Sequence, residues 1–191
     1  MKRWLWLCTL VASGLGIAQG GFAGEICKGT QLKNPALGLS EIYAMADGCA
    51  KAWQKDAVPA KITNTALGPL QPNGSSVAWS LQFYSAQAKS VLTVTTFRGS
   101  LTYSAEAGSA GRIPDLKPDF FRDGAKLYSL AQQHGAALLT QGYFVMIATA
   151  AAPSDRHATW YINFSNAQSK NGAISVIVNA NTGVVEKVVK D

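Results

Sequence analysis

The chain has 191 residues, of which 48% are hydrophobic and 15% are charged, and its formal net charge at pH 7 is +6. This length suits one compact domain or two small ones that share a core. The positive residues are scattered singly, without a run of Lys and Arg or a basic helix face of the kind that follows phosphates, which argues against a nucleic-acid partner.

Residues 1–23 are predicted to be a secretory signal peptide. Lys2 and Arg3 precede an apolar run that ends at Ala12, and small residues then lead to Ala23, after which we expect cleavage. The apolar run is too short for a stable membrane anchor, which needs about 20 apolar residues. Cleavage removes two basic residues and no acid, so the mature chain has 15 basic and 11 acidic residues and a net charge of +4. We expect a periplasmic or secreted protein.

Two cysteines remain after cleavage, Cys27 and Cys49. Because the envelope is oxidising, an even pair in an exported protein predicts a disulfide, here between the N-terminal tail and the first helix. A loop of this size gives a stabilisation of about 3 kcal/mol on a loop-entropy basis. A redox or nucleophilic thiol is the alternative, but neither a CxxC motif nor a neighbouring His is present to activate one.

Residues 24–103 are predicted to form a first unit of one helix and an antiparallel sheet. Apolar residues recur at three- and four-residue spacing between Ser40 and Trp53, which indicates a helix with Ser40 as its cap. In KITNTAL, 61–67, we expect a weak strand or none. Alternation of apolar and polar residues predicts three further strands, WSLQFY (79–84), VLTVTTF (91–97) and SLTYS (100–104).

Residues 104–118 are rich in Gly, Ala, Ser and Pro and are predicted to be a linker. A second helix is expected to begin at Pro118 and Asp119, with Asp119 as its cap. Its buried stripe is predicted to hold Phe120, Gly124, Leu127, Ala131, His134 and Leu138. Four strands are expected between residues 143 and 190, so residues 119–191 form a second unit of the same kind.

An internal repeat supports this division. The segment WSLQFYSAQAK, 79–89, recurs 81 positions later as WYINFSNAQSK, with Trp, Phe, Ala, Gln and Lys at identical spacing. Projecting this offset backwards places ITNTALGP opposite YFVMIATA. A single unit of about 75 residues has a marginal core, and a second copy supplies the rest. We predict an α+β protein of two tandem units, each a helix followed by three or four antiparallel strands, with Trp79 and Trp160 at equivalent places between sheet and helix.

The segment NANTGVVEKV, 179–188, follows an alternating strand and places Asn179, Thr182 and Gly183 in a turn before the last strand. In these residues the second unit resembles the PepSY domain family, whereas the first unit matches only at Gly99. The tandem layout with a disulfide near its first helix is also similar to that of the beta-lactamase inhibitory proteins. The PepSY resemblance implies an exported, non-catalytic modulator of peptidases or other envelope proteins, and it transfers no catalytic residue.

The sequence contains two histidines, His134 and His157, and a metal site or a Ser/His/Asp triad would have to use one of them. His134 lies on the predicted helical stripe, where a satisfied core imidazole is the simpler interpretation, and His157 lies in a polar loop. Zinc, nucleophile-elbow and phosphate-loop motifs are absent from the sequence. We predict no cofactor, no metal and no enzymatic activity, with a small envelope hydrolase as the alternative.

The polar residues of the repeated strand and its turn are the candidate binding site. They are Gln82, Tyr84, Gln87 and Lys89 in the first unit and Tyr161, Asn163, Gln168 and Lys170 in the second. Tyr adds contact area at small entropic cost, and Asn and Gln adapt their hydrogen bonds, although an ordinary solvated sheet face has the same pattern. We expect a binding or inhibitory module for a periplasmic or secreted protein such as a peptidase or hydrolase. An immunity or assembly factor is a further alternative.

Overall fold

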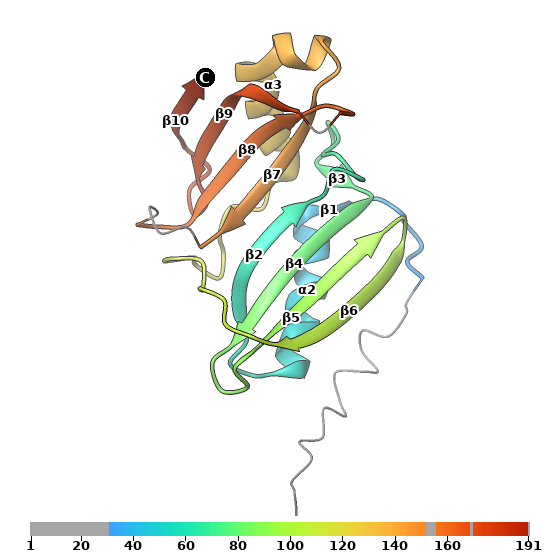
Figure 1. Cartoon of the computed structure of the whole chain (residues 1–191), viewed down its shortest axis with the longest axis vertical. Helices are drawn as coiled ribbons and strands as arrows, with labels where there is room; N and C mark the ends of the chain where they lie inside the picture. Colours follow the sequence, from blue (N-terminus) through green and yellow to red (C-terminus); the bar gives the residue numbers. More distant parts are fainter. Residues whose placement is uncertain (1–30, 152–155, 169, 191) are drawn as a thin grey trace, which may run out of the picture.

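The main element of the structure, a computed structural model that describes residues 31–151, 156–168 and 170–190, is one antiparallel sheet. Its eight strands lie in the order β10-β9-β8-β7-β2-β4-β5-β6. The helices α2 and α3 both lie on the same face of this sheet (Figure 1). The protein is therefore of the α+β class, as predicted. The predicted signal peptide and Cys27 lie outside the described residues, and Cys49, the predicted disulfide partner, is buried on α2.

The N-terminal half consists of a helix and four strands of the large sheet. These are α2 (Leu39–Trp53), β2 (Val58–Asn64), β4 (Ala78–Ser85), β5 (Ser90–Phe97) and β6 (Ser100–Ala107). Two short strands, β1 (Leu37–Gly38) and β3 (Ser75–Ser76), pair separately. The last strand, β6, extends through Ala107 into the segment that was predicted to be a linker.

The strand β2 corrects the expectation of a weak first strand or none in this half. It has seven residues and lies in the middle of the sheet. Pro59 and Lys61 interrupt its apolar pattern, so the alternation that predicts a strand is missing from the sequence. A proline is tolerated because β2 pairs with β7 only from Lys61 onwards, and because the pairing with β4 shifts register between Pro59 and Lys61.

The C-terminal half repeats this order of elements. It consists of α3 (Gly124–Thr140), β7 (Phe144–Ala150), β8 (Thr159–Ser165), β9 (Asn171–Asn179) and β10 (Val185–Lys190). The prediction that α3 begins at Pro118 with Asp119 as its cap is wrong. The cap is Asp123, whose carboxylate accepts a hydrogen bond of 2.9 Å from the backbone N–H of Lys126. Phe120 is buried as predicted, but in the loop before the helix.

The predicted cap of the first helix is also wrong. Gly38 occupies the N-cap position of α2 and has no side chain with which to cap. Ser40 instead donates a hydrogen bond of 2.9 Å from Oγ to the backbone carbonyl of Arg122, 82 positions away. This bond ties the loop before α3 to the start of α2.

The two halves meet where β2 pairs with β7. Three antiparallel residue pairs form this seam, Lys61–Ala150, Ile62–Thr149 and Thr63–Ala148. The buried side chain of Asn64 continues it: its Oδ1 accepts a hydrogen bond of 2.7 Å from the N–H of Ile147, and its Nδ2 donates to the carbonyl of Gly68 at 2.9 Å. The side chain of Asn64 thus satisfies backbone groups at the point where the pairing of β2 with β7 ends.

Strand pairing allows the two halves to be compared strand by strand. Ile62 pairs with Leu81, and Ile147 pairs with Ile162. Leu81 and Ile162 are 81 positions apart, but Ile62 and Ile147 are 85 apart. The backward projection that placed ITNTALGP opposite YFVMIATA is therefore wrong by four residues, because the connection that follows the first strand is shorter in the C-terminal half.

The hydrophobic core lies between the helices and the sheet. Trp79 and Trp160 are fully buried there. Each indole N–H donates a hydrogen bond of 2.9 Å to a backbone carbonyl just ahead of a helix, that of Leu37 for Trp79 and that of Phe121 for Trp160. This confirms that the two tryptophans lie at the interface between sheet and helix.

Candidate functional site

No helix or strand of the described residues covers the face of the large sheet that points away from α2 and α3, and we call it the open face (Figure 1). Alternation along the strands directs Trp79, Leu81 and Phe83 to the core and the intervening residues to this face. Strand pairing defines a row of open-face residues that crosses all eight strands. In order, the row is Lys187, Ile177, Tyr161, Ala148, Thr63, Ser80, Thr95 and Thr102.

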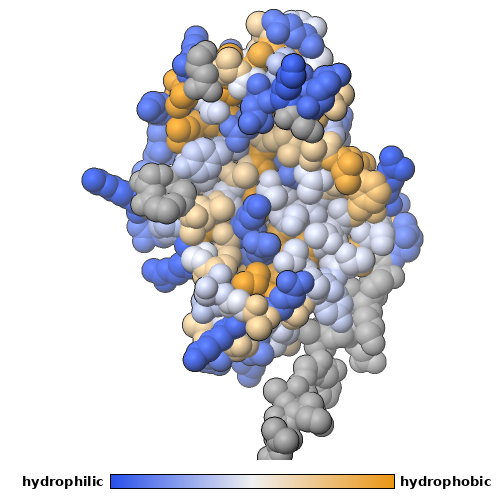
Figure 2. All heavy atoms as spheres, in the orientation of Figure 1, coloured by the Kyte–Doolittle hydropathy of each residue, from blue (hydrophilic) through white to orange (hydrophobic). Residues whose placement is uncertain are grey.

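Small hydroxyl-bearing side chains make up half of the row, all of them on β2, β4, β5 and β6, and two exposed lysines, Lys61 and Lys187, stand on the open face. Figure 2 views the molecule from this side and shows pale side chains of intermediate hydropathy over the middle of the sheet. Strongly hydrophilic side chains gather mainly at the margin (Figure 2). The surface is therefore polar and adaptable at its centre.

Four of the eight predicted binding residues lie on the open face, each half-buried. Gln82 and Tyr84 belong to β4, and Tyr161 and Asn163 belong to β8. Asn163 accepts a hydrogen bond of 2.7 Å from Ser175 Oγ on the neighbouring strand. Because β7 and β2 lie between β8 and β4, the two groups are about 14 Å apart across the sheet.

The other four predicted residues are exposed at two turns. Gln87 and Lys89 lie between β4 and β5, and Gln168 and Lys170 lie between β8 and β9. Successive neighbours from β8 to β4 are antiparallel, so β8 and β4 run in opposite directions. The two turns therefore lie at opposite ends of the sheet (Figure 1). The structure does not bring all eight residues into one patch.

Both turns are held by a side-chain oxygen. Asp56 accepts hydrogen bonds from the N–H of Gln87 at 3.0 Å and from Ser85 Oγ at 2.7 Å. At the other turn, Asn166 Oδ1 accepts from the N–H of Gln168 and from that of Lys170, each at 3.0 Å. Sequence reasoning missed both supports. Asn166 lies inside the repeated segment, where Asn is a common turn residue, but Asp56 is 31 positions from Gln87.

The hydrogen bonds at Asp56 predict a pH dependence of stability. The backbone N–H of Gln87, followed by the hydroxyl of Ser85, lowers the pKa of Asp56 below its ordinary value of 3.8. A lowered folded-state pKa contributes stability above the unfolded-state pKa, and this contribution is lost as the pH falls through the folded-state value. Asp56→Ala should therefore lower Tm at neutral pH, and the difference from the parent protein should shrink below a pH of about 3.8.

Thermal unfolding followed by circular dichroism at neutral pH and at about pH 3 measures this difference. Asp119→Ala is the matched control, because Asp119 is an exposed acid whose side chain makes no hydrogen bond within the described residues. An equal decrease in Tm at both pH values for Asp56→Ala would contradict the proposed role of its carboxylate.

The two histidines lie in different settings. His134 is half-buried on α3. His157 Nε2 lies 2.8 and 3.0 Å from the carboxylate oxygens of Glu186, which also accepts a hydrogen bond of 3.0 Å from Asn179. Burial alone would raise the pKa of Glu186, but the hydrogen bonds from His157 and Asn179 outweigh it and lower that pKa. Within the described residues, no Ser or Cys side chain bonds to either histidine, and no three His, Cys, Asp or Glu side chains converge as metal ligands.

In the part of the chain that the structure describes, neither helix combines the length and the apolar composition needed to cross a membrane. Comparison of the chain with protein-family models, with curated proteins and with solved structures finds no match.

Proposed function

We propose that the protein is an exported binding or inhibitory module, without enzymatic activity, that docks the open face of its sheet onto a folded protein of the bacterial envelope. Two tandem copies of one helix-plus-sheet unit, the second of them PepSY-like, build this face, and a disulfide between Cys27 and Cys49 fixes the N-terminal tail. Inhibition would be steric, since the face would cover part of the partner's surface or its active-site cleft.

The continuity of the sheet across the seam is the observation on which this proposal mainly depends. A row of eight strands is about 34 Å wide at a strand spacing near 4.8 Å, which is sufficient for an interface of ordinary size, about 800 Å² per partner. The strands are hydrogen-bonded to one another, and the turns are held by Asp56 and Asn166. Little ordering of this surface is therefore needed on binding.

Charge indicates what kind of surface the partner presents. Lys61 lies on β2, in the seam, and Lys187 lies on β10 at the edge of the sheet. Lys89 and Lys170 are exposed at the two turns, so positive charge borders the polar centre on several sides. A partner surface that is polar and bears carboxylates is complementary to this arrangement, and such complementarity sets specificity and the rate of association.

Affinity capture from periplasmic extract, followed by a titration with the captured partner, tests this proposal. The mature protein from Gly24, with its disulfide formed, is compared with Lys61→Glu and with a Tyr84→Ala/Tyr161→Ala double variant. Both open-face variants should weaken binding by about tenfold or more. Lys126→Glu is the matched control, because Lys126 is an exposed lysine on α3 on the other side of the sheet, and it should bind like the parent protein.

Full affinity in both open-face variants would contradict the proposal, as would a loss that is confined to Lys126→Glu. A single tight partner that is a secreted toxin or an assembly component would favour the immunity or assembly alternative. The His157–Glu186 pair is the observation that favours the hydrolase alternative, which predicts that His157→Ala abolishes an activity while the protein stays folded.

A further inference from the structure

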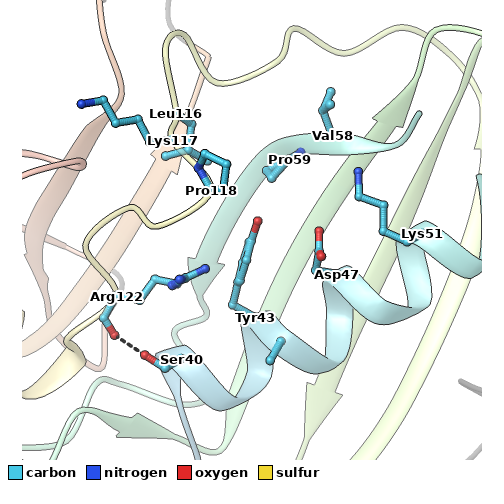
Figure 3. A pocket seen from close by; sticks show the side chains of 11 residues that line it. Ser40, Tyr43, Asp47, Lys51, Val58, Pro59, Leu116, Lys117, Pro118 and Arg122 are labelled. Carbon is cyan, nitrogen blue, oxygen red and sulfur yellow. Dashed lines mark hydrogen bonds between the residues drawn. The ribbon is translucent and has the colours of Figure 1, made fainter. Parts of the chain in front are cut away.

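A groove lies on the helix side of the sheet, between α2 and the segment that leads into α3 (Figure 3). Its volume is about 620 Å³. Polar side chains of α2 and Arg122 line it, together with an apolar wall. The apolar wall consists of Val58, Pro59, Leu116 and Pro118. The hydrogen bond from Ser40 Oγ to the carbonyl of Arg122 holds the two sides of the groove together.

Arg122 has the features of an anion-binding residue. Its guanidinium carbon lies over two aromatic rings, at 4.8 Å from the centroid of Tyr43 and 4.7 Å from that of Phe120. Cation–π contacts of this kind position the guanidinium but give its N–H groups no oxygen acceptor. Within the described residues, none of these N–H groups has a hydrogen-bond or ion-pair partner. A half-buried arginine that two aromatic rings hold in place is suited to bind a carboxylate with two parallel hydrogen bonds.

The hydroxyl of Tyr43 is a second donor in the same space. The Tyr43 side chain is 8% exposed, and its ring packs edge-on against Phe120 at 4.8 Å. Its hydroxyl points into the groove, the Arg122 guanidinium lies beside its ring (Figure 3), and the hydroxyl has no hydrogen-bond partner among the described residues. Burial and the charge of Asp47 raise the pKa of Tyr43 to about 12, although Arg122 acts in the opposite direction. The hydroxyl therefore remains protonated and able to donate near neutral pH.

The two lysines of the groove are placed differently from Arg122. Lys51 Nζ already donates a hydrogen bond to the carbonyl of Ala57. Lys117 extends away from the groove in Figure 3. Asp47, one helical turn after Tyr43, directs its carboxylate into the groove and can accept a hydrogen bond from a ligand (Figure 3). The groove thus has an anion-binding end at Arg122 and an acceptor at Asp47.

We propose that this groove binds a carboxylate that carries an apolar group and an N–H donor, the combination present in an acylated amino acid and at a peptide C-terminus. The carboxylate of the ligand binds Arg122 and Tyr43. The N–H group of the ligand donates a hydrogen bond to Asp47, and the apolar group of the ligand lies against Val58 and Leu116. A neighbouring groove of about 680 Å³ shares the apolar wall and continues to Arg112 and Asp115, which leaves room for preceding residues of a peptide. This site lies on the opposite side of the sheet from the open face, so the two proposals can fail independently.

A heteronuclear NMR titration of the mature protein with N-acetyl-leucine and with N-acetyl-leucinamide tests this inference. The acid should give saturable shifts in α2 and in residues 112–122, and the uncharged amide should bind about tenfold more weakly or not at all. Arg122→Gln should weaken binding of the acid by about tenfold or more, and Tyr43→Phe by several-fold.

Two matched controls are available in the chain. The guanidinium of Arg98 also lies over an aromatic ring, that of Phe97 at 5.1 Å, but it lies at the β5–β6 turn outside the groove. Arg98→Gln and Tyr84→Phe should therefore bind the acid like the parent protein. If Arg122→Gln does not fold, Tyr43→Phe decides the question, since it keeps the ring and removes only the hydroxyl.

Three results would overturn the inference: no saturable shift with the acid, equal affinity for acid and amide, or full affinity in Arg122→Gln or Tyr43→Phe. A titration with acetyl-Ala-Ala-Leu distinguishes the two sources of the carboxylate. Tighter binding than that of N-acetyl-leucine supports a peptide C-terminus, and equal binding supports a small acylated amino acid.

Discussion

Replacement of either buried tryptophan by alanine is expected to destabilise the protein by about 3 to 5 kcal/mol. Trp79 and Trp160 are each 0% exposed, and each bonds through its indole to a carbonyl next to a helix. Alanine leaves a large cavity and a buried carbonyl without its donor, and both effects lower the free energy of unfolding. Similar losses at the two sites are expected because both side chains are fully buried and each indole bonds to a carbonyl ahead of a helix.

Urea unfolding followed by circular dichroism, with linear extrapolation, measures these losses. Trp53→Ala is the control. Trp53 is half-buried at the last residue of α2, so its replacement should lower the free energy of unfolding by less. Trp160→Phe should lie between the parent protein and Trp160→Ala, because it keeps an aromatic ring and removes the donor. A loss below about 1 kcal/mol for Trp79→Ala or Trp160→Ala would contradict their place in the core.

Gly135→Ala on α3 is expected to destabilise by about 1 to 3 kcal/mol or more, although alanine favours helices. A Cβ atom at Gly135 would overlap the ring of the fully buried Phe164, and neither side can move without disturbing the core. The backbone at Gly135 is also non-helical, with φ of −127° and ψ of 23°. Helix α3 therefore depends on a residue without a side chain where it crosses Phe164.

A matched substitution on the other helix should have the opposite effect. A Cβ atom at Gly48 of α2 meets nothing within 4 Å, so Gly48→Ala should stabilise by about 0.5 to 1 kcal/mol. Combining Gly135→Ala with Phe164→Leu should give a smaller loss than the sum of the two single changes, because leucine makes room for the methyl group. Additive losses would show that the clash with Phe164 is not the cause.

The strands that alternate strictly could be predicted from the sequence, and the first strand of the sheet could not. In WSLQFY each residue falls on the face that its polarity indicates. In β2, Pro59 and Lys61 break this pattern, and the strand exists because its neighbours on both sides supply partners. The prediction of Ser40 as a helix cap was wrong for a related reason, because its hydroxyl bonds to the distant Arg122 rather than to its own helix.

In the candidate sites, too, the features that local alternation determines could be predicted, and those that depend on distant contacts could not. Alternation along β4 and β8 was enough to place Tyr84 and Tyr161 on a polar face. That the turns of these strands point to opposite ends depends on the pairing of β2 with β7, which no local pattern reveals. The contact of Tyr43 with Arg122 was missed because it joins residues 79 positions apart, and each of them alone has an ordinary local interpretation.

The seam between β2 and β7 also has a consequence for folding kinetics. Asn64 and Ile147, which it joins, are 83 positions apart, whereas Val58 and Tyr84, the most distant pair between two strands of the N-terminal half of the sheet, are 26 apart. Pairing of residues that are far apart in the chain requires a large loop to close and tends to form late. We therefore expect each half to collapse around its own hairpins first, with the Asn64 bonds forming in the final docking step. In native-state hydrogen exchange, the amide of Ile147 should accordingly lose protection through a smaller opening than that of Val94 within a hairpin.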